Sequence, residues 1–339
     1  MTAKGPLVVS PRLDAKPWGG RRLEAFGFGL PPDQAIGEAV VTAPDAVVEG
    51  GVQLSQIVGE RPEAALGERG LAATGEKVTF PLLVKLIDAN EDLSIQVHPD
   101  DAAAAREGDG QSLGKTEAWW VLDADPGSAL YLGLRPGVTL DDLATASRGG
   151  TGAAHLMRRV SAQPNTLVFL PAGTVHALGA GVLVYEIQQP SAITYRLDDW
   201  GRVDAAGRPR ELHVEQGLAV ADASSRPEPI PPVTLPSASG RRQLLVACPY
   251  FALERIALVA GEEVGLVAAE SPQTVTCLQG TVQVTADGRT VALQAGQTAV
   301  LLADAAGAAM RADSPTVALR AWVPDESTIR MMADRQPSA

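Results

Sequence analysis

The sequence has little cysteine and no long apolar run. Only two cysteines occur among 339 residues, Cys248 and Cys277, which excludes a disulfide scaffold and a cysteine-based zinc finger. No stretch approaches the ~20 consecutive apolar residues that a membrane helix needs, and the N-terminus lacks the apolar core of a signal peptide. We therefore expect a cytoplasmic protein with no membrane partner.

Positive charge is also scarce. The chain has 28 Lys and Arg against 40 Asp and Glu, which gives a net charge of −12 at pH 7. This balance argues against binding of nucleic acid or anionic lipid by bulk charge. An anionic small molecule must therefore meet a local cluster of cations.

The hydrophobic pattern predicts a mainly β protein. Short alternating or apolar runs with turn signals between them are typical of a barrel or sandwich. We expect edge structure and a loop-rich cover over residues 1–80 with a helix near 54–66, and helical insertions at 100–107 and 139–160. The expected strands are 82–87, 93–98, 118–122, 129–134, 166–170, 183–188 and 193–197, and then 251–259, 274–278, 281–285, 290–293, 298–302 and 317–323.

The length favours two domains, and composition indicates where they meet. Residues 226–240 are rich in proline and serine, as in a stiff linker. We therefore expect a first domain over residues 1–225, a linker over 226–240 and a C-terminal domain over 241–339. The C-terminal domain has no histidine.

The chain has only four histidines, so a histidine-based site has few possible members. In the segment 93–100, strand alternation sends Ser94, Gln96 and His98 to one face. The same alternation places Lys115 and Glu117 on one face if their segment is extended.

A third segment, 165–177, enters a Pro-Gly turn after which His176 begins the next strand. Two imidazoles, a carboxylate and an amide oxygen form a donor set that suits zinc, and less selectively manganese, iron, cobalt or nickel. Taken singly, each buried histidine is more often a satisfied core residue than a ligand. In the segment 186–202, alternation places Thr194, Arg196 and Asp198 on one face, although Arg196 could form only a surface ion pair.

Together these segments resemble the type I mannose-6-phosphate isomerases, specifically their short bacterial branch, over roughly residues 8–325. The Pro-x-Gly-x-x-His element alone resembles the second motif of cupins, and the other motifs narrow the resemblance. The motifs that carry it are Pro81 to Ala89, Leu93 to Asp101, Gly114 to Glu117, Pro171 to Ala177, and Glu186 to Gln189 joined to Thr194 to Arg196.

The resemblance assigns a role to individual residues. The metal ligands that it implies are Gln96, His98, Glu117 and His176. The catalytic residues that it implies are Arg196, which helps to hold the enediolate, and Lys115, which assists proton movement. Lys85, Ser94, Glu186 and Arg202 are expected to contact the substrate, and Lys85, Arg202 or nearby amides are expected to capture the phosphate.

The resemblance also implies a fold and an activity. It implies two cupin-type β-barrel (jelly-roll) domains, with helical insertions in the first and no metal in the second. One Zn²⁺ per chain, or another divalent transition metal, would serve interconversion of mannose 6-phosphate and fructose 6-phosphate through a cis-enediol. The expected partner is the sugar phosphate, and the chain is expected to be a monomer or homodimer.

One departure from the family leaves alternatives open. Many relatives have Asp after the serine that corresponds to Ser191, whereas this chain has Ala192. A sugar-phosphate-binding bicupin without turnover is therefore an alternative function. A third possibility is another cupin enzyme, such as a metal-dependent oxygenase, although the pairing of Lys115 with Arg196 argues against it.

Overall fold

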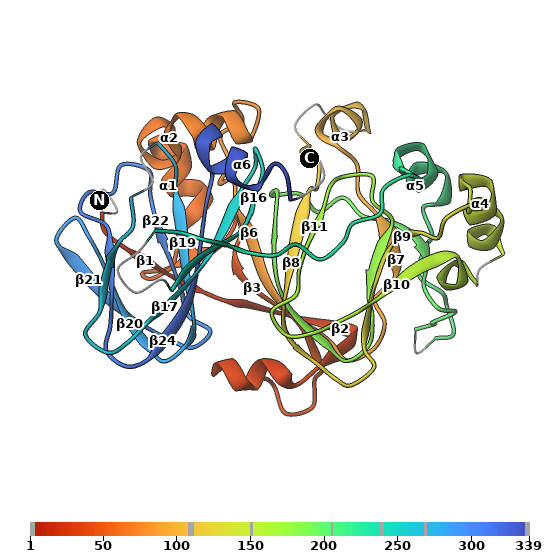
Figure 1. Cartoon of the computed structure of the whole chain (residues 1–339), viewed down its shortest axis with the longest axis horizontal. Coiled ribbons are helices and arrows are strands. Elements are labelled where there is room, and N and C mark those ends of the chain that lie inside the picture. The colour runs from red at the N-terminus through yellow and green to blue at the C-terminus, as the bar shows by residue number, and fades with distance from the viewer. Residues whose placement is uncertain are drawn as a thin grey trace.

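The structure is a computed structural model that describes residues 4–107, 112–149, 152–204, 206–236, 241–267 and 270–335. It confirms the mainly β fold. Four antiparallel sheets are arranged in two facing pairs (Figure 1). The division into two cupin-type domains at residues 226–240 stays a prediction.

The first pair of sheets faces across a buried cluster that includes Leu130 and Val184. The five-stranded sheet has the order β10 (Met157–Ser161), β9 (Ala129–Leu134), β12 (His176–Leu178), β7 (Ile95–Val97) and β14 (Tyr195–Asp198). The six-stranded sheet has the order β11 (Leu167–Leu170), β8 (Glu117–Ala124), β13 (Val182–Gln188), β6 (Leu83–Ala89), β3 (Ile36–Thr42) and β2 (Arg12–Gly20).

The second pair encloses another buried cluster, which includes Val275 and Met310. Its nine-stranded sheet has the order β15 (Val233–Thr234), β16 (Arg242–Ala247), β17 (Ala252–Leu258), β24 (Thr316–Trp322), β19 (Gln273–Gln279), β22 (Thr298–Leu301), β1 (Leu7–Ser10), β4 (Val47–Val48) and β5 (Val52–Gln53). Its four-stranded sheet has the order β18 (Glu263–Gly265), β23 (Ala309–Ala312), β20 (Thr281–Ala286) and β21 (Arg289–Gln294).

Short helices cover the ends and outer faces of these sheets. None of the helices in the described residues is long and apolar enough to cross a bilayer. The helices are η1 (Arg22–Phe26), α1 (Leu54–Glu60), α2 (Pro62–Ala73), α3 (Asp101–Glu107), α4 (Leu140–Arg148), η2 (Ala153–Leu156), α5 (Val214–Val220) and α6 (Glu326–Met332).

The expected helix at 139–160 is right only in its first part. Thr139 and Asp142 form a capping box that starts α4, and the helix ends at Arg148. Residues 157–161 instead form β10, which pairs with β9. The alternating burial of β10 fits a strand on the edge of its sheet.

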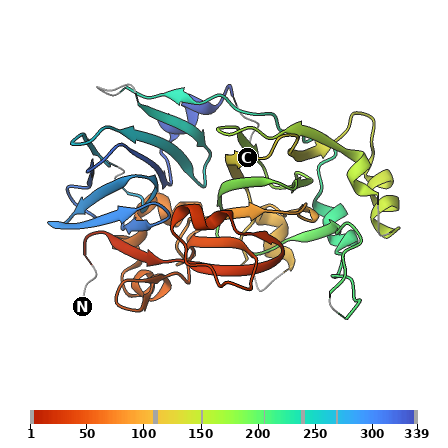
Figure 2. The ribbon, with the colours of Figure 1, turned by 90° about the horizontal axis from the view of Figure 1, so that it is seen from below.

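At the N-terminus the expected edge structure is present in β2, which is an edge strand of the six-stranded sheet, but residues 7–53 contain more strand than a loop-rich cover implies. Strands β2 and β3 extend the six-stranded sheet, whereas β1 lies in the nine-stranded sheet, where Leu7 pairs with Val300. In Figure 2 the N-terminal strand starts beside the strands of the C-terminal half. The proline-rich segment also joins this sheet, because Val233 pairs with Leu244; its residues 237–240 lie outside the described residues.

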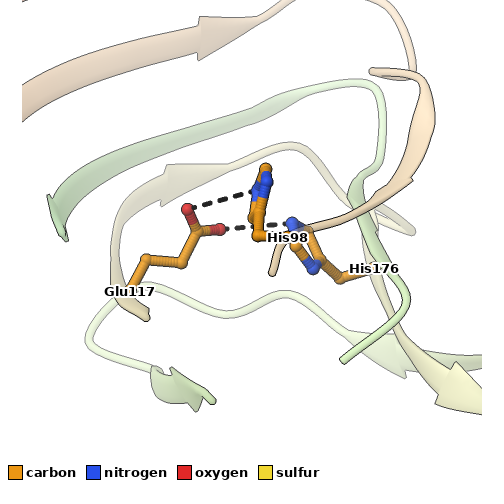
Figure 3. Close-up of side chains that lie close together, drawn as sticks. All are labelled: His98, Glu117 and His176. Carbon is orange, nitrogen blue, oxygen red and sulfur yellow. Dashed lines mark ion pairs between the residues drawn. The ribbon is translucent and has the colours of Figure 1, made fainter. Parts of the chain in front are cut away.

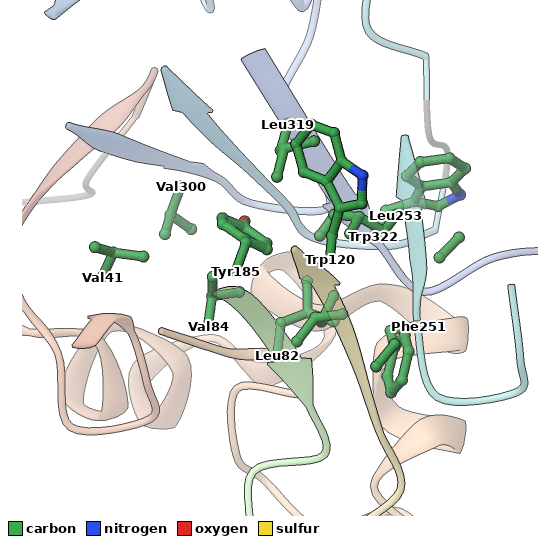
Figure 4. Close-up of a cluster of buried hydrophobic side chains, with 14 of the residues drawn as sticks. Val41, Leu82, Val84, Trp120, Tyr185, Phe251, Leu253, Val300, Leu319 and Trp322 are labelled. Carbon is green, nitrogen blue, oxygen red and sulfur yellow. The ribbon is translucent and has the colours of Figure 1, made fainter. Parts of the chain in front are cut away.

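A shared hydrophobic core joins the two pairs of sheets. The six-stranded and nine-stranded sheets press their outer faces together, with Trp120 and Tyr185 from one side and Leu253 and Leu319 from the other (Figure 4). Side chains of a strand alternate between its two faces, so β8 and β13 contribute one face to the shared core. Their other face points into the first pair of sheets. The inward face carries Trp119 and Glu186, which belong to the site described below.

We predict that Leu319→Ala lowers the free energy of unfolding by about 2–5 kcal/mol, because it leaves a cavity in this shared core. Leu319 is fully buried. Chemical denaturation followed by fluorescence measures the change, and Val78→Ala at an exposed position is the control. A loss of under about 0.5 kcal/mol, as expected for a surface change, contradicts the shared core.

Candidate metal centre

Three side chains from distant parts of the chain converge inside the first pair of sheets. Glu117 Oε1 lies 3.2 Å from Nε2 of His176, and Glu117 Oε2 lies 3.6 Å from Nε2 of His98 (Figure 3). One donor atom from each residue lies within 4.8 Å of the other two. All three side chains are buried.

The outer ring nitrogens hold both imidazoles in a fixed orientation. Nδ1 of His98 lies 2.8 Å from the carbonyl oxygen of Ile193, and Nδ1 of His176 lies 2.8 Å from that of Thr174. Each Nδ1 therefore donates its proton to a carbonyl, and each Nε2 keeps a lone pair that points at the cluster. Backbone carbonyls orient metal-binding histidines in this way.

A tight turn brings the strand of His176 against His98. Gly173 has a φ of +85°, a conformation that favours glycine, and its N–H donates to the carbonyl of His98 at 2.8 Å. A Cβ at this position would meet the carbonyl oxygen of Val220 at 3.0 Å. The turn therefore places His98 and His176 on adjacent segments.

Burial changes the protonation of the cluster. Burial and the Lys115 ammonium lower the pKa of His176 to about 4, and they lower the pKa of His98 well below its ordinary value. Burial raises the pKa of Glu117 to about 7, although the cation of Lys115 opposes that shift. Both imidazoles are therefore neutral near pH 7, which is the form that binds a metal.

Gln96 and Lys115 reach the same cluster. The amide nitrogen of Gln96 lies 3.4 Å from Nε2 of His176 and 3.5 Å from Nε2 of His98. Because rotation of an amide by 180° exchanges its oxygen and nitrogen, the Gln96 oxygen can take this position. Lys115 Nζ lies 3.0 Å from Nε2 of His98 and hydrogen-bonds to Glu117.

These residues fit a divalent transition metal. Ligand atoms around a tetrahedral zinc ion at ~2.1 Å are about 3.4 Å apart, close to the separations seen here. Glu117 Oε1 is buried without a hydrogen-bond partner among the described residues, and a cation would satisfy it. Two imidazoles, a carboxylate and an amide oxygen are a donor set that zinc accepts.

Strand register places the neighbouring polar side chains in two rows. In the five-stranded sheet, Gln96 of β7 pairs with His176 of β12 on one side and with Arg196 of β14 on the other. In the six-stranded sheet, Glu186 of β13 pairs with both Lys85 and Trp119. The two sheets face each other, so the rows form opposite walls of one space.

That space is a polar cavity of about 460 Å³, within the size range of small-molecule sites. Lys85 Nζ lies 3.4 Å from Glu186 Oε1, and the Trp119 indole N–H donates to Glu186 Oε2 at 2.8 Å. Although burial opposes each shift, Glu186 and Glu38 raise the pKa of Lys85, and Lys115 together with Lys85 lowers the pKa of Glu186, so both groups are charged. The predicted residues that line the cavity are Lys85, Ser94, Gln96, Lys115, Glu186 and Arg196.

Arg202 is not among the residues that line the cavity, and its expected contact with the substrate stays a prediction. Its guanidinium donates to the carbonyl of Asp92 at 2.5 Å and to Asp199 at 2.6 Å. Arg210 lines the cavity and binds Asp199 through Nε at 2.7 Å. Sequence reasoning missed Arg210 because it lies in an irregular segment, where strand alternation gives no direction.

Two further predictions about this wall differ in outcome. Thr194 and Arg196 both line the cavity, as alternation predicts. Asp198 does not share their wall, because the pairing of β14 shifts between Arg196 and Asp198 and the Asp198 carboxylate accepts from the backbone N–H of Ala153. Such a bulge reverses the direction of the side chains beyond it.

The fold and the site define a mainly β protein with a buried metal centre beside a polar cavity. The family description "Phosphomannose isomerase type I, catalytic domain" matches residues 8–116. Mannose-6-phosphate isomerase ManA of Bacillus subtilis (strain 168) is 38% identical over 227 residues, which cover 66% of this chain and 70% of that protein. The chain belongs to the type I mannose-6-phosphate isomerase family.

Solved structures have the same fold. The crystal structure of the mannose 6-phosphate isomerase from Bacillus subtilis matches with a TM-score of 0.80 and 28% identity, and it covers 94% of this chain and 99% of that chain. A crystal structure of mannose 6-phosphate isomerase bound with zinc and yttrium matches with a TM-score of 0.71 and 17% identity, over 94% of this chain and 100% of that chain.

We predict that His176→Ala abolishes retention of the metal, because it removes one imidazole from a four-residue donor set. Elemental analysis of the purified protein measures this loss. His155→Ala is the control, since His155 is exposed in η2, and it should leave the metal content unchanged. Equal loss of metal from both variants contradicts the assignment of His176.

Proposed function

We propose that this protein is a metal-dependent aldose–ketose isomerase that interconverts mannose 6-phosphate and fructose 6-phosphate through a cis-enediol. The observation that carries the proposal is the donor cluster of His98, Glu117 and His176, which lies beside the cavity and is reached from the cavity wall by Gln96 and Lys115. The candidate metal ligands thus adjoin the cavity whose wall carries Lys115 and Arg196. Membership of the isomerase family supports the same reaction.

In this proposal Gln96, His98, Glu117 and His176 hold one Zn²⁺ ion. The donor set fits zinc, and a neighbour with the same fold is described as bound with zinc. A bound divalent cation supplies electrostatic stabilisation for the negative charge that develops on the substrate oxygens.

The reaction removes a proton from C2, adds one to C1 and moves a hydroxyl proton from O2 to O1. Arg196 stabilises the enediolate, because its guanidinium is the cation adjacent to Gln96 in the sheet. Lys115, held between His98 and Glu117, assists proton transfer at the substrate oxygens. Ala192 also lines the cavity and offers only a methyl group, so the acid–base groups come from elsewhere on this wall.

Lys85, Ser94 and Glu186 orient the sugar. Glu186 Oε1 forms an ion pair with Lys85 and has room to accept a further bond from a sugar hydroxyl. Lys85 lies between the carboxylates of Glu186 and Glu38, which fix its ammonium in the wall. Such contacts align the reacting carbons with Arg196.

Arg210 anchors the phosphate in this proposal, in place of Arg202. Arg202 and Arg210 share one carboxylate, that of Asp199. Arg196 donates to the backbone carbonyl of Glu211 at 2.8 Å, and its Nε is buried without a hydrogen-bond partner in the described part of the chain. The guanidinium groups of Arg196, Arg202 and Arg210 gather near the carboxylates of Asp199 and Glu211, which leaves one positive charge in excess in an otherwise acidic protein.

Other cations of the cavity wall are balanced by carboxylates. Arg12 forms ion pairs with Asp14 and Asp45, and Lys16 forms an ion pair with Glu38 at 3.2 Å. A substrate dianion therefore gains more near Arg210. The difference in charge balance therefore favours binding of the phosphate beside Arg210.

The alternative of a binding protein without turnover rests on Ala192 alone and is not favoured, because the relatives that match are named as isomerases. The expected cytoplasmic location stays a prediction, as does the choice between monomer and homodimer.

We predict that metal-loaded protein converts mannose 6-phosphate to fructose 6-phosphate, and that Arg196→Ala keeps its metal but lowers kcat by about 10²- to 10³-fold. The physical reason is the loss of charge stabilisation as the enediolate forms. A coupled spectrophotometric assay with parallel metal analysis measures both quantities. No turnover by the metal-loaded wild type would overturn the proposed function, and unchanged kcat in the variant would remove Arg196 from the mechanism.

We predict that Arg210→Ala raises KM for mannose 6-phosphate by roughly 10- to 100-fold, the value of a charge-assisted hydrogen bond. Any conversion of unphosphorylated mannose should change little. Arg208→Ala is the matched control, because Arg208 lies in the same segment, is exposed and pairs only with Asp204 among the carboxylates of the described residues. Equal effects of the two variants on KM contradict the role of Arg210.

A further inference from the structure

One hydrogen bond connects the C-terminal half to the segment that carries Lys115. The hydroxyl of Tyr250 donates to Asp101 Oδ2 at 2.9 Å. Tyr250 lies in a turn after β16, where the N–H of Cys248 donates to the carbonyl of Phe251 at 2.9 Å. Phe251 is buried and packs against Phe169 of β11, so the turn is held in the shared core.

The other oxygen of Asp101 reaches both sides of Lys115. Asp101 Oδ1 accepts from the backbone N–H of Gly114 at 2.7 Å and from the side-chain amide of Gln189 at 3.1 Å. The oxygen of that same amide accepts from the backbone N–H of Thr116 at 2.9 Å. One carboxylate thus fixes residue 114 directly and residue 116 through Gln189.

The backbone of Lys115 itself is also held. Its N–H donates to the carbonyl of Pro99 at 2.9 Å, so three consecutive amides have defined acceptors. Gly114 packs against the backbone of Asp101, where an added Cβ would lie 2.5 Å from the backbone nitrogen. The segment has little freedom to shift along its own axis.

We propose that Asp101 and Tyr250 are positioning residues that hold Lys115 in its catalytic place, so that the C-terminal half contributes to catalysis without touching the substrate. This inference rests on the proposed function. The Lys115 ammonium hydrogen-bonds to Glu117 Oε2 and lines the cavity, and a small displacement of the segment breaks this contact. Misplacement of a catalytic group by about 1 Å costs up to ~10²-fold in rate.

The Tyr250 hydroxyl acts here as a donor. Burial and the adjacent Asp101 carboxylate raise the pKa of Tyr250, so it keeps its proton at neutral pH. Tyr250→Phe removes only this hydroxyl and leaves the ring in place. The substitution therefore tests the hydrogen bond without opening a cavity.

Tyr185→Phe provides a matched control. The Tyr185 hydroxyl also joins the two halves, through a hydrogen bond of 3.2 Å to Thr276, but it makes no contact with the segment of Lys115. Both variants lose one hydroxyl that joins the two halves, from a half-buried residue in Tyr250 and from a buried one in Tyr185. A general effect on packing or stability therefore changes both alike.

We expect Tyr250→Phe to lower kcat about 3- to 10-fold, with unchanged KM, metal content and melting temperature, whereas Tyr185→Phe leaves kcat unchanged. Asp101→Asn should lower kcat further, because its amide offers one acceptor instead of two oxygens. Equal kcat in the two tyrosine variants, or a fall in kcat that follows metal loss or melting temperature, overturns the inference.

A readout without turnover separates this inference from the proposed function. Hydrogen exchange of a peptide covering residues 112–119, followed by mass spectrometry, should speed up in Tyr250→Phe about 10-fold at the amides of Gly114 and Thr116. Tyr185→Phe should leave this peptide unchanged. Unchanged exchange in Tyr250→Phe overturns the positioning role, whereas inactivity of the wild type with faster exchange in the variant overturns only the isomerase function.

Discussion

The side chain of Glu117 is fully buried. A buried carboxylate is costly in free energy unless opposite charges or hydrogen-bond donors contact it. Lys115, His98 and His176 are the groups that do so, and each comes from a different segment. Lys115 supplies a positive charge, while the neutral imidazoles supply nitrogen lone pairs that only a cation can join to the carboxylate. The groups that make up this cluster are therefore suited to bind a metal ion.

Two sheets meet this requirement through their register. His176, Gln96 and Arg196 lie side by side because β12 and β14 both pair with β7. A shift of one residue in either pairing turns the polar side chain away from the cavity and an apolar one toward it. The apolar alternate residues, such as Ile95 and Val97, pack on the other face beneath α4 and α5. Packing of the apolar residues on one face of the sheet thus sets the register that places His176, Gln96 and Arg196 on the other face.

For residues within regular strands or directly beside them, strand alternation in the sequence predicted which side chains share a face. Gln96 and His98 share a face, and Lys115 meets Glu117, as the period of two requires. The same reasoning could not place Arg210, because the segment before α5 is irregular and its direction is set by Asp199. It also could not place Tyr250, whose partner Asp101 is distant in sequence and becomes a neighbour only through packing of the two halves.

The pairing of β1 could not be predicted either, because it depends on a contact between segments that are distant in sequence. Nothing in residues 7–10 distinguishes a strand of the nearer sheet from one of the farther sheet, and contact with β22 decides between them. Because β1 and β2 follow each other directly yet lie in different sheets, the chain crosses the shared core at its beginning. The metal-binding sandwich therefore folds against a second sandwich that holds part of its own N-terminal segment. A half that has no histidine is thereby joined to the half that carries the proposed site, through a common core and through the turn that carries Tyr250.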